Sequence, residues 1–224
     1  MKKLIFAILI MMPFVGLFAQ EGSDYKPDGG FVLGVNFTPL EVGGNVISID
    51  NINGRYFLNS GLAVRVGLGL STSKDSYDNG LEGNANETSS KSTSEFSFSL
   101  GAEKHFAGTE RLSPYIGADL GLSMASAKAE TTIAGVTSTI EGASDATGAD
   151  RKHTTFGLNL VAGADFYVAK HLYLGVEIKY GFAVKSEGEY TVSSGGLSVT
   201  SKDKPKNTTI GQMAQPSLKL GFKF

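Results

Sequence analysis

The feature that most constrains this chain is an alternation of apolar residues with small or polar ones. In Leu62–Leu70, leucine and valine occupy every even position, while alanine, arginine and glycine occupy the odd ones. The same alternation recurs over residues 31–37, 95–102, 115–124, 155–168, 172–184 and 217–224. A period of two is typical of a β-strand with two different faces, and not of a helix. The sequence therefore predicts an all-β protein.

The segment between the first two of these stretches has to supply one further strand. Ile47 and Ile49 share one parity, whereas Tyr56 and Leu58 share the other. A bulge or bend near Asn53–Gly54 would reconcile them, because one extra residue reverses the face to which later side chains point. With this strand the sequence predicts eight antiparallel strands, each near the ~9–11 residues that a tilted strand needs to cross a bilayer.

The N-terminal residues have the composition of a secretory signal peptide. Lys2 and Lys3 precede an almost wholly apolar run over residues 4–19, after which the chain becomes polar. The run is shorter than the ~20 residues of a spanning helix, and Pro13 interrupts it. We therefore predict a signal peptide over residues 1–19 rather than an uncleaved anchor helix.

The remaining residues, 20–224, are predicted to form one domain, because all-β barrels commonly reach ~200–250 residues. No later stretch is apolar for anything near ~18 residues. Only helices and closed barrels satisfy their backbone in lipid. If the mature chain is a membrane protein, it must therefore span the membrane as a closed, up-and-down transmembrane β-barrel.

The predicted connections alternate in length. Short ones lie at residues 58–61, 107–114 and 169–171, and long polar ones at residues 73–93, 127–152 and 186–208. The first connection, at residues 38–44, is short where the alternation requires a long one. Short turns at one end and long loops at the other are typical of outer-membrane barrels. Because the long segments lack hydrophobic periodicity, we predict mobile loops there.

Alternation alone leaves open which face points outward, since a soluble lipocalin-like barrel also alternates, with its apolar face inward. Here the face opposite the apolar one is rich in glycine: Gly34, Gly67, Gly69, Gly101, Gly117, Gly121, Gly157, Gly163, Gly175, Gly181 and Gly221. Glycine is a poor choice for a solvated exterior. In a narrow eight-stranded lumen it leaves room for large neighbours. We therefore predict that the glycine face lines the lumen.

The same parity carries four cationic and four anionic side chains. The predicted lumen charge network comprises Arg65, Glu103, Asp119, Asp165, Glu177, Lys179, Lys219 and Lys223. Paired charges are tolerable in such an interior, whereas unpaired ones are costly. Glu177 and Lys179 could form a charge gate, or they could belong to a structural layer of ion pairs. Tyr115, Phe166, Tyr167, Tyr173 and Phe224 are expected near the short-turn end, as an interfacial girdle or partly inside the lumen.

Composition excludes several classes of protein. A formal net charge of −2 gives no basic surface for nucleic acid. The absence of cysteine excludes disulfides, thiolate zinc sites and a cysteine nucleophile. The three histidines, His105, His153 and His171, have no metal-ligand spacing and are expected to be solvated or interfacial. No nucleophile is fixed next to a base, so we expect no metal, no cofactor and no enzyme activity.

Taken together, the signal segment, the eight alternating strands, the asymmetric connections and the closing "LKLGFKF" resemble the small outer-membrane β-barrels of Gram-negative bacteria, of the OmpA/OmpX type. The resemblance covers essentially the whole mature chain and implies a location in the outer membrane, surrounded by its lipid. It also implies a C-terminal signal read by the barrel-assembly machinery. The signal would comprise Leu218, Leu220, Phe222 and Phe224, with Pro216 an unusual member. The chain differs from OmpA itself, because no periplasmic domain is expected after the barrel.

The sequence leaves more than one function open. The first hypothesis is an integral outer-membrane barrel with a structural or surface-interaction role, long extracellular loops and no general-diffusion pore. The second is a small channel or transporter that uses the charged lumen. The third is a soluble ligand-binding barrel. The partner of the loops cannot be read from the sequence.

Overall fold

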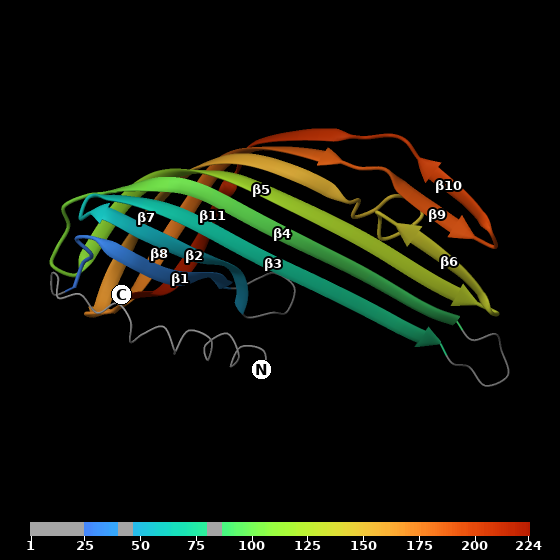
Figure 1. The fold of residues 1–224 in the computed structure, drawn as a ribbon, viewed down its shortest axis with the longest axis horizontal. Helices are drawn as coiled ribbons and strands as arrows, with labels where there is room; N and C mark the ends of the chain where they lie inside the picture. The colour runs from blue at the N-terminus through green and yellow to red at the C-terminus, as the bar shows by residue number, and fades with distance from the viewer. Residues whose placement is uncertain (1–24, 40–46, 80–86) are drawn as a thin grey trace.

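The computed structural model of the chain describes residues 25–39, 47–79 and 87–224, which form one antiparallel sheet (Figure 1). Its strands are β1 (Gly30–Pro39), β2 (Ile47–Asn59), β3 (Leu62–Asn79), β4 (Glu87–His105), β5 (Leu112–Ile133), β6 (Val136–Glu141), β7 (His153–Ala169), β8 (Leu172–Glu187), β9 (Tyr190–Ser194), β10 (Leu197–Ser201) and β11 (Lys206–Lys223). Within these residues no helix is long and apolar enough to cross a membrane. The predicted signal peptide lies outside the described residues, as does most of the first predicted connection.

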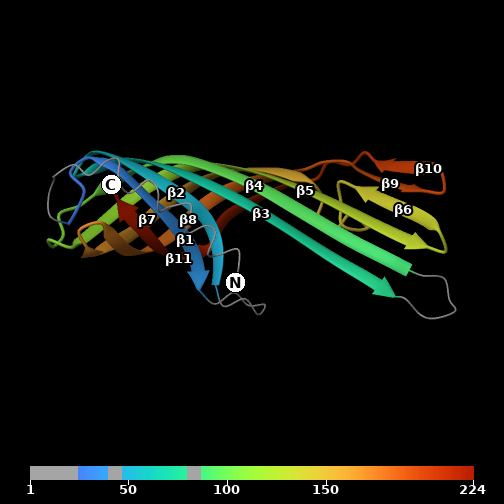
Figure 2. The same ribbon diagram turned by 60° about the horizontal axis from the view of Figure 1, so that its bottom comes forward.

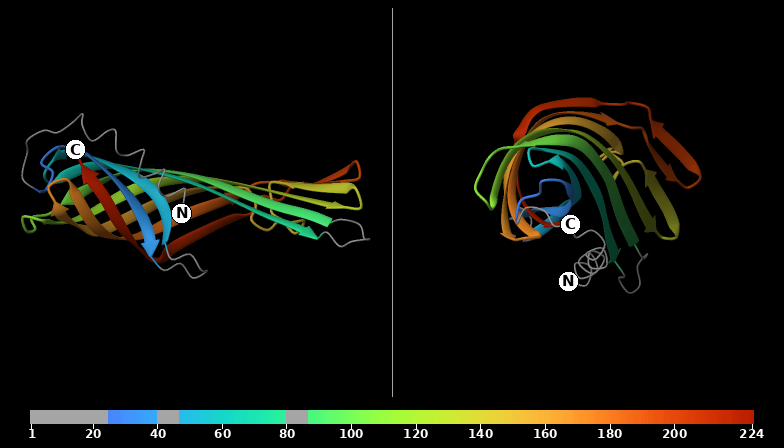
Figure 3. Two further views of the ribbon diagram at one scale, coloured as in Figure 1. Left: turned by 90° about the horizontal axis from the view of Figure 1, so that it is seen from below. Right: turned by 60° about the vertical axis from the view of Figure 1, so that its left-hand side comes forward.

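Eight of these strands close into a ring. Their order around the ring is β1, β2, β3, β4, β5, β7, β8 and β11, and β11 pairs again with β1. Figure 3 shows β11 lying beside β1 on the wall of the barrel. Every pairing in the ring is antiparallel. The predicted eight-stranded antiparallel barrel is thereby confirmed.

The apolar face of the ring points outward. Leu160, Val176 and Ile116 are 61%, 55% and 52% exposed, whereas Arg65 and Glu177, which lie on the opposite parity, are 5% and 1% exposed. An exterior of leucine, valine and phenylalanine is stable only against an apolar medium, because burial of such surface is worth about 25 cal/mol per Å². The predicted assignment of the two faces is therefore correct.

The prediction of mobile loops at residues 73–93, 127–152 and 186–208 is wrong for most of these residues. They continue the barrel wall as β-structure: residues 71–79 pair with 87–95, and these pair with 125–133. Then β6, β9 and β10 add one after another at the free side of β5. We call this protruding sheet the extension; it lies at the right in Figures 1 and 2.

The extension forms because its threonine, valine and tyrosine residues favour strands and its ladder satisfies the backbone donors and acceptors. Hydrophobic periodicity did not indicate it, because the outward apolar face stops where the extension begins. On β5 the outward residue Met124 is 50% exposed. The next outward residues include Lys128 and Glu130, which form an exposed ion pair at 2.8 Å, while Ala127 and Ala129 on the inward face are buried.

The second strand contains a bulge, but not where the sequence placed it. The β1–β2 register pairs Asn36 with Asn51 and Phe37 with Ile49, so Asp50 is the extra residue. The expected position was Asn53–Gly54, a few residues later. The bulge reverses the parity of β2, so that Ile52 and Tyr56 point outward while Phe57 is buried inside. An extra residue at any position between Ile49 and Tyr56 gives the same parity change for the residues used in the prediction, so the pattern could not locate it.

Candidate functional site

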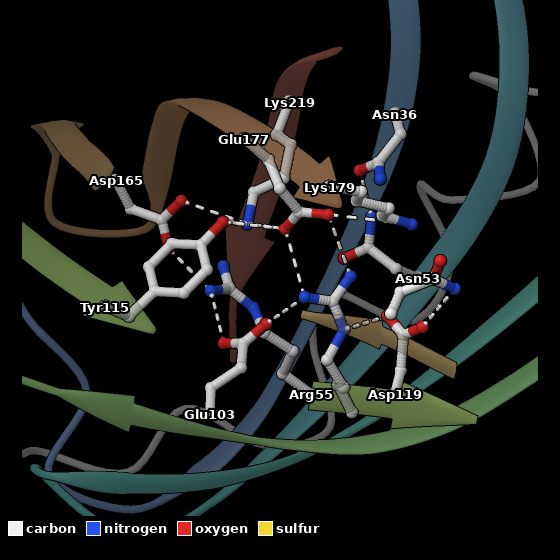
Figure 4. Close-up of polar contacts among 12 residues, drawn as sticks. Asn36, Asn53, Arg55, Glu103, Tyr115, Asp119, Asp165, Glu177, Lys179 and Lys219 are labelled. Carbon is white, nitrogen blue, oxygen red and sulfur yellow. Dashed lines mark hydrogen bonds and ion pairs between the residues drawn. The ribbon is translucent and has the colours of Figure 1, made fainter. Parts of the chain in front are cut away.

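The inside of the barrel contains a cluster of buried charged and aromatic side chains. Its members come from seven strands of the ring and have almost no accessible surface: Arg55, Arg65, Glu103, Tyr115, Asp119, Asp165, Glu177 and Lys219. Figure 4 shows most of these side chains converging on one another from opposite walls. We call them the lumen cluster. Because buried charges without partners are costly, the cluster has to be understood through its ion pairs.

Arg65, on β3, connects three acidic groups. Its Nη1 lies 2.9 Å from Glu103 Oε1 on the neighbouring strand β4. Across the lumen, Nη1 and Nη2 each donate at 3.0 Å to the two carboxylate oxygens of Glu177 on β8. Its Nε lies 3.7 Å from Asp119 Oδ2 on β5. A two-pronged contact of this kind fixes the guanidinium in both position and orientation.

Arg55, on β2, is the second hub, and it is absent from the predicted network. Its Nη1 donates to Asp165 Oδ2 at 2.5 Å and to Glu103 Oε2 at 3.2 Å. Its guanidinium carbon lies 4.8 Å from the centre of the Tyr173 ring. The signal that could have found it is the outward parity of Tyr56 and Leu58, which turns the odd-numbered Arg55 toward the lumen. The unlocated bulge in β2 obscured this signal.

Lys219, on β11, completes the cluster on the far wall. Its Nζ lies 3.3 Å from Asp165 Oδ1 and 3.4 Å from Glu177 Oε2, and it donates to the Tyr115 hydroxyl at 2.5 Å. That hydroxyl in turn donates to Glu177 Oε2 at 2.7 Å. Lys179 lies at the margin, 3.6 Å from Glu177, with 26% of its side chain exposed. With Lys179 the cluster holds four cationic and four anionic groups.

Glycines place these partners within reach. In three rows of register partners, a glycine on the middle strand separates two side chains that meet across it. These rows are Arg65–Gly101–Asp119, Tyr115–Gly163–Glu177 and Asp165–Gly175–Lys219. A Cβ on Gly163 would clash with the Tyr115 ring, and one on Gly175 would clash with the Asp165 carboxylate. The glycines of the inner face therefore allow contacts between strands two positions apart.

The structure also decides between the two expected positions of the aromatic residues and places one histidine. Tyr115, Tyr167 and Tyr173 are at most 2% exposed and lie inside the lumen, whereas Phe166 points outward. The alternative of lumen-filling aromatics therefore holds for the tyrosines, because they share the glycine parity. His105 is also buried, with Nε2 3.1 Å from Glu103 Oε2 and Nδ1 2.9 Å from Ser113 Oγ. Its expected solvated or interfacial position is wrong.

The remaining predicted site residues lie where β11 ends. The Nζ of Lys223 donates to the backbone oxygen of Lys26 at 3.3 Å, and Lys223 is 8% exposed. Leu218, Leu220 and Phe222 lie in the β1–β11 pairing, while Phe224 donates its backbone N–H to Phe31 and packs on Phe222. For Pro216 only the strand position is described, opposite Ile178.

The lumen cluster can hold charge inside an apolar wall without leaving it unpaired. Arg55, Glu103, Glu177 and Lys219, from four different strands of the ring, are each only 1% exposed, so side chains fill the interior at this level. The outward face of the ring around the cluster is apolar. These properties suit a barrel that lies in a membrane.

The chain is similar to one protein family and to two solved structures. Residues 42–224 match the family model described as "Putative OmpA-OmpF-like porin family". Among solved structures, the outer membrane protein OprG from Pseudomonas aeruginosa matches 89% of this chain and 98% of its own, with 11% identity and a TM-score of 0.46. CarO from Acinetobacter baumannii matches 88% and 97%, with 15% identity and a TM-score of 0.33. No curated protein matches.

Proposed function

The chain belongs to the "Putative OmpA-OmpF-like porin family", and from this premise we propose that it is a closed barrel with a structural and surface-interaction role rather than a general-diffusion pore. It is a porin-like β-barrel protein of the outer membrane. The observation that carries the proposal is the buried lumen cluster. An eight-stranded barrel has an interior just wide enough to be filled by side chains, and here fully buried arginine, tyrosine and glutamate residues occupy it.

The extension is the part that we propose to contact the surroundings of the cell. Outer-membrane barrels have short turns on the periplasmic side and long connections outside, which puts the extension at the cell surface. Within the described residues, no strand pairs with the second edge of β10. Leu197 and Val199 on β10 are 78% and 72% exposed. An unpaired edge with exposed apolar residues favours interaction with another molecule.

The remaining partners follow from the same proposal. The outward leucine, valine and phenylalanine side chains contact outer-membrane lipid. The C-terminal strand residues, Leu218 to Phe224, serve as the signal for the barrel-assembly machinery. An N-terminal signal peptide over residues 1–19 directs export. The proposed role is non-catalytic, and we assign no partner to the extension.

The proposal is tested by purifying the protein in detergent and recording in planar bilayers. We expect a heat-modifiable band on gels and no reproducible conductance steps. Protease shaving of intact cells should cleave the extension and leave the barrel intact. Steady conductance of the size seen for general-diffusion porins would contradict the closed lumen, and resistance of the extension in intact but not in lysed cells would contradict its orientation.

A small channel is the second candidate, and one observation favours it. Lys179 is partly exposed and lies 3.6 Å from Glu177, at the margin of the buried cluster. A rearrangement of this pair would change the charge that lines the lumen. Glu177→Gln should then produce conductance steps if the pair acts as a gate. A silent Glu177→Gln variant that remains folded supports a structural layer of ion pairs instead.

A further inference from the structure

One row of register partners crosses the seam at which the barrel closes. The row runs from Tyr173 on β8 through Gly221 on β11 and Gly34 on β1 to Asn53 on β2. A Cβ built on Gly34 would lie 2.5 Å from the Tyr173 hydroxyl and 3.3 Å from Asn53 Oδ1, and one built on Gly221 would clash with the Tyr173 ring. The ring therefore lies over two consecutive glycines and reaches from β8 to β1.

The seam beneath this ring is the pairing of β1 with β11, and its register is not set by a turn between the two strands. It joins the first and last strands of the described chain through six register partners, from Val32 opposite Lys223 to Phe37 opposite Leu218. No turn connects these strands. The alternation of faces excludes a slip of one residue but not of two, because a two-residue slip keeps every side chain on its own face. Apolar patterning alone therefore permits several closed registers.

We propose that Tyr173 selects the register in which β1 and β11 close the barrel. Gly221 stays beneath the ring in every register, because the β8–β11 pairing is unaffected by a slip at the seam. A two-residue slip brings either Asn36 or Val32 to the place of Gly34. Each carries a side chain where even a Cβ meets the Tyr173 hydroxyl at 2.5 Å. Forcing extra atoms into such a packed site is destabilising, so the glycine pair and the ring select one register.

A control residue separates this role from ordinary burial. Tyr167 is as buried as Tyr173, and the two ring centres are 5.7 Å apart. Among the described glycines, however, none has a Tyr167 atom among the nearest atoms to its Cβ position. Removing the Tyr167 ring should weaken the barrel without changing the register of its seam.

The experiment measures the register directly by disulfide cross-linking. The natural chain has no cysteine, so pairs can be introduced without background. Val35→Cys with Leu220→Cys reports the native register, since these two residues are opposite each other. Val35→Cys with Phe222→Cys reports one two-residue slip, and Val35→Cys with Leu218→Cys reports the other. Each pair is refolded into detergent micelles, oxidised, and the folded band is analysed.

We expect the native pair alone to cross-link in the otherwise unchanged protein and with Tyr167→Ala. With Tyr173→Ala, the ratio of slipped to native cross-link should rise on the order of tenfold, the size expected when a steric overlap of one side chain no longer excludes the slip. An unchanged ratio in folded Tyr173→Ala overturns the proposal. So does an equal rise with Tyr167→Ala.

A second variant keeps the ring and tests the proposal even if Tyr173→Ala does not fold. Asn36→Gly offers a second glycine that can lie beneath the ring. It should increase the cross-link of the Val35→Cys and Phe222→Cys pair and leave the Val35→Cys and Leu218→Cys pair unchanged. Equal increases in both slipped pairs, or in neither, contradict the proposed selection.

Discussion

Replacement of Arg55 by alanine is the sharpest test of the lumen cluster. Arg55→Ala removes one guanidinium group that contacts Asp165 at 2.5 Å and Glu103 at 3.2 Å. Both carboxylates stay buried. Asp165 keeps Lys219 at 3.3 Å, and Glu103 keeps Arg65 at 2.9 Å. Each acid therefore loses its share of a network but does not become isolated.

The magnitude follows from the cost of breaking a buried ion pair. Removing one partner of such a pair costs about 3–5 kcal/mol, because the other charge remains buried without compensation. Since each acid here retains a cation, we expect a loss near the lower end, about 3 kcal/mol in the free energy of unfolding. The double variant Arg55→Ala with Asp165→Asn should lose less than the sum of the single variants, because both changes remove the same Arg55–Asp165 ion pair.

The assay is urea unfolding in lipid vesicles. The folded fraction is measured as the protein that resists trypsin and that shows the heat-modifiable gel shift. Lys128→Ala is the matched control, since Lys128 forms an ion pair with Glu130 at 2.8 Å that is about half exposed at each side chain. Exposed pairs contribute about 0–1 kcal/mol. A loss below ~1 kcal/mol for Arg55→Ala, or strict additivity with Asp165→Asn, would refute the reasoning.

Two further predictions follow from the inner glycines and the C-terminal strand. Gly163→Ala should destabilise the barrel by about 1–3 kcal/mol, because its Cβ overlaps the Tyr115 ring. Gly121→Ala is the control and should change stability little, because its Cβ meets nothing nearer than 3.9 Å. Equal losses of stability in urea unfolding would contradict the proposed role of the glycines. Deleting Phe224 should lower the amount of folded protein in the outer membrane far more than deleting the turn Gly195–Gly196, and equal amounts on quantitative immunoblots would count against the C-terminal signal.

The sequence alone was sufficient for the ring and its polarity, because both depend on a local pattern. Leucine and valine at every second position define each strand and its outward face. Glycine at the intervening positions identifies the inner face, since only a crowded interior needs so many small residues. The acids Glu103, Asp119, Asp165 and Glu177 were read from this parity, and the structure places all of them inside.

The rest could not be read because it depends on contacts between distant strands. Arg55 lies in a strand whose bulge hides its parity, so its role as a hub appears only when β2 pairs with its neighbours. The outward face of the extension is largely polar, so the alternation of apolar residues that identifies the other strands is missing there, although its residue types favour strands. The rows of side chain, glycine and side chain depend on registers across three strands, which no local pattern fixes.

The central claim is that the apolar face of the barrel contacts lipid and the charged face is enclosed. Single spin-labelled cysteines at successive positions of β7, from Phe156 to Ala162, test it most directly, because the chain has no other cysteine. In vesicles, the even-numbered positions should collide readily with dissolved oxygen and the odd-numbered positions with neither oxygen nor a water-soluble nickel complex. Oxygen access at the odd-numbered positions, with the even-numbered positions protected, would contradict the account.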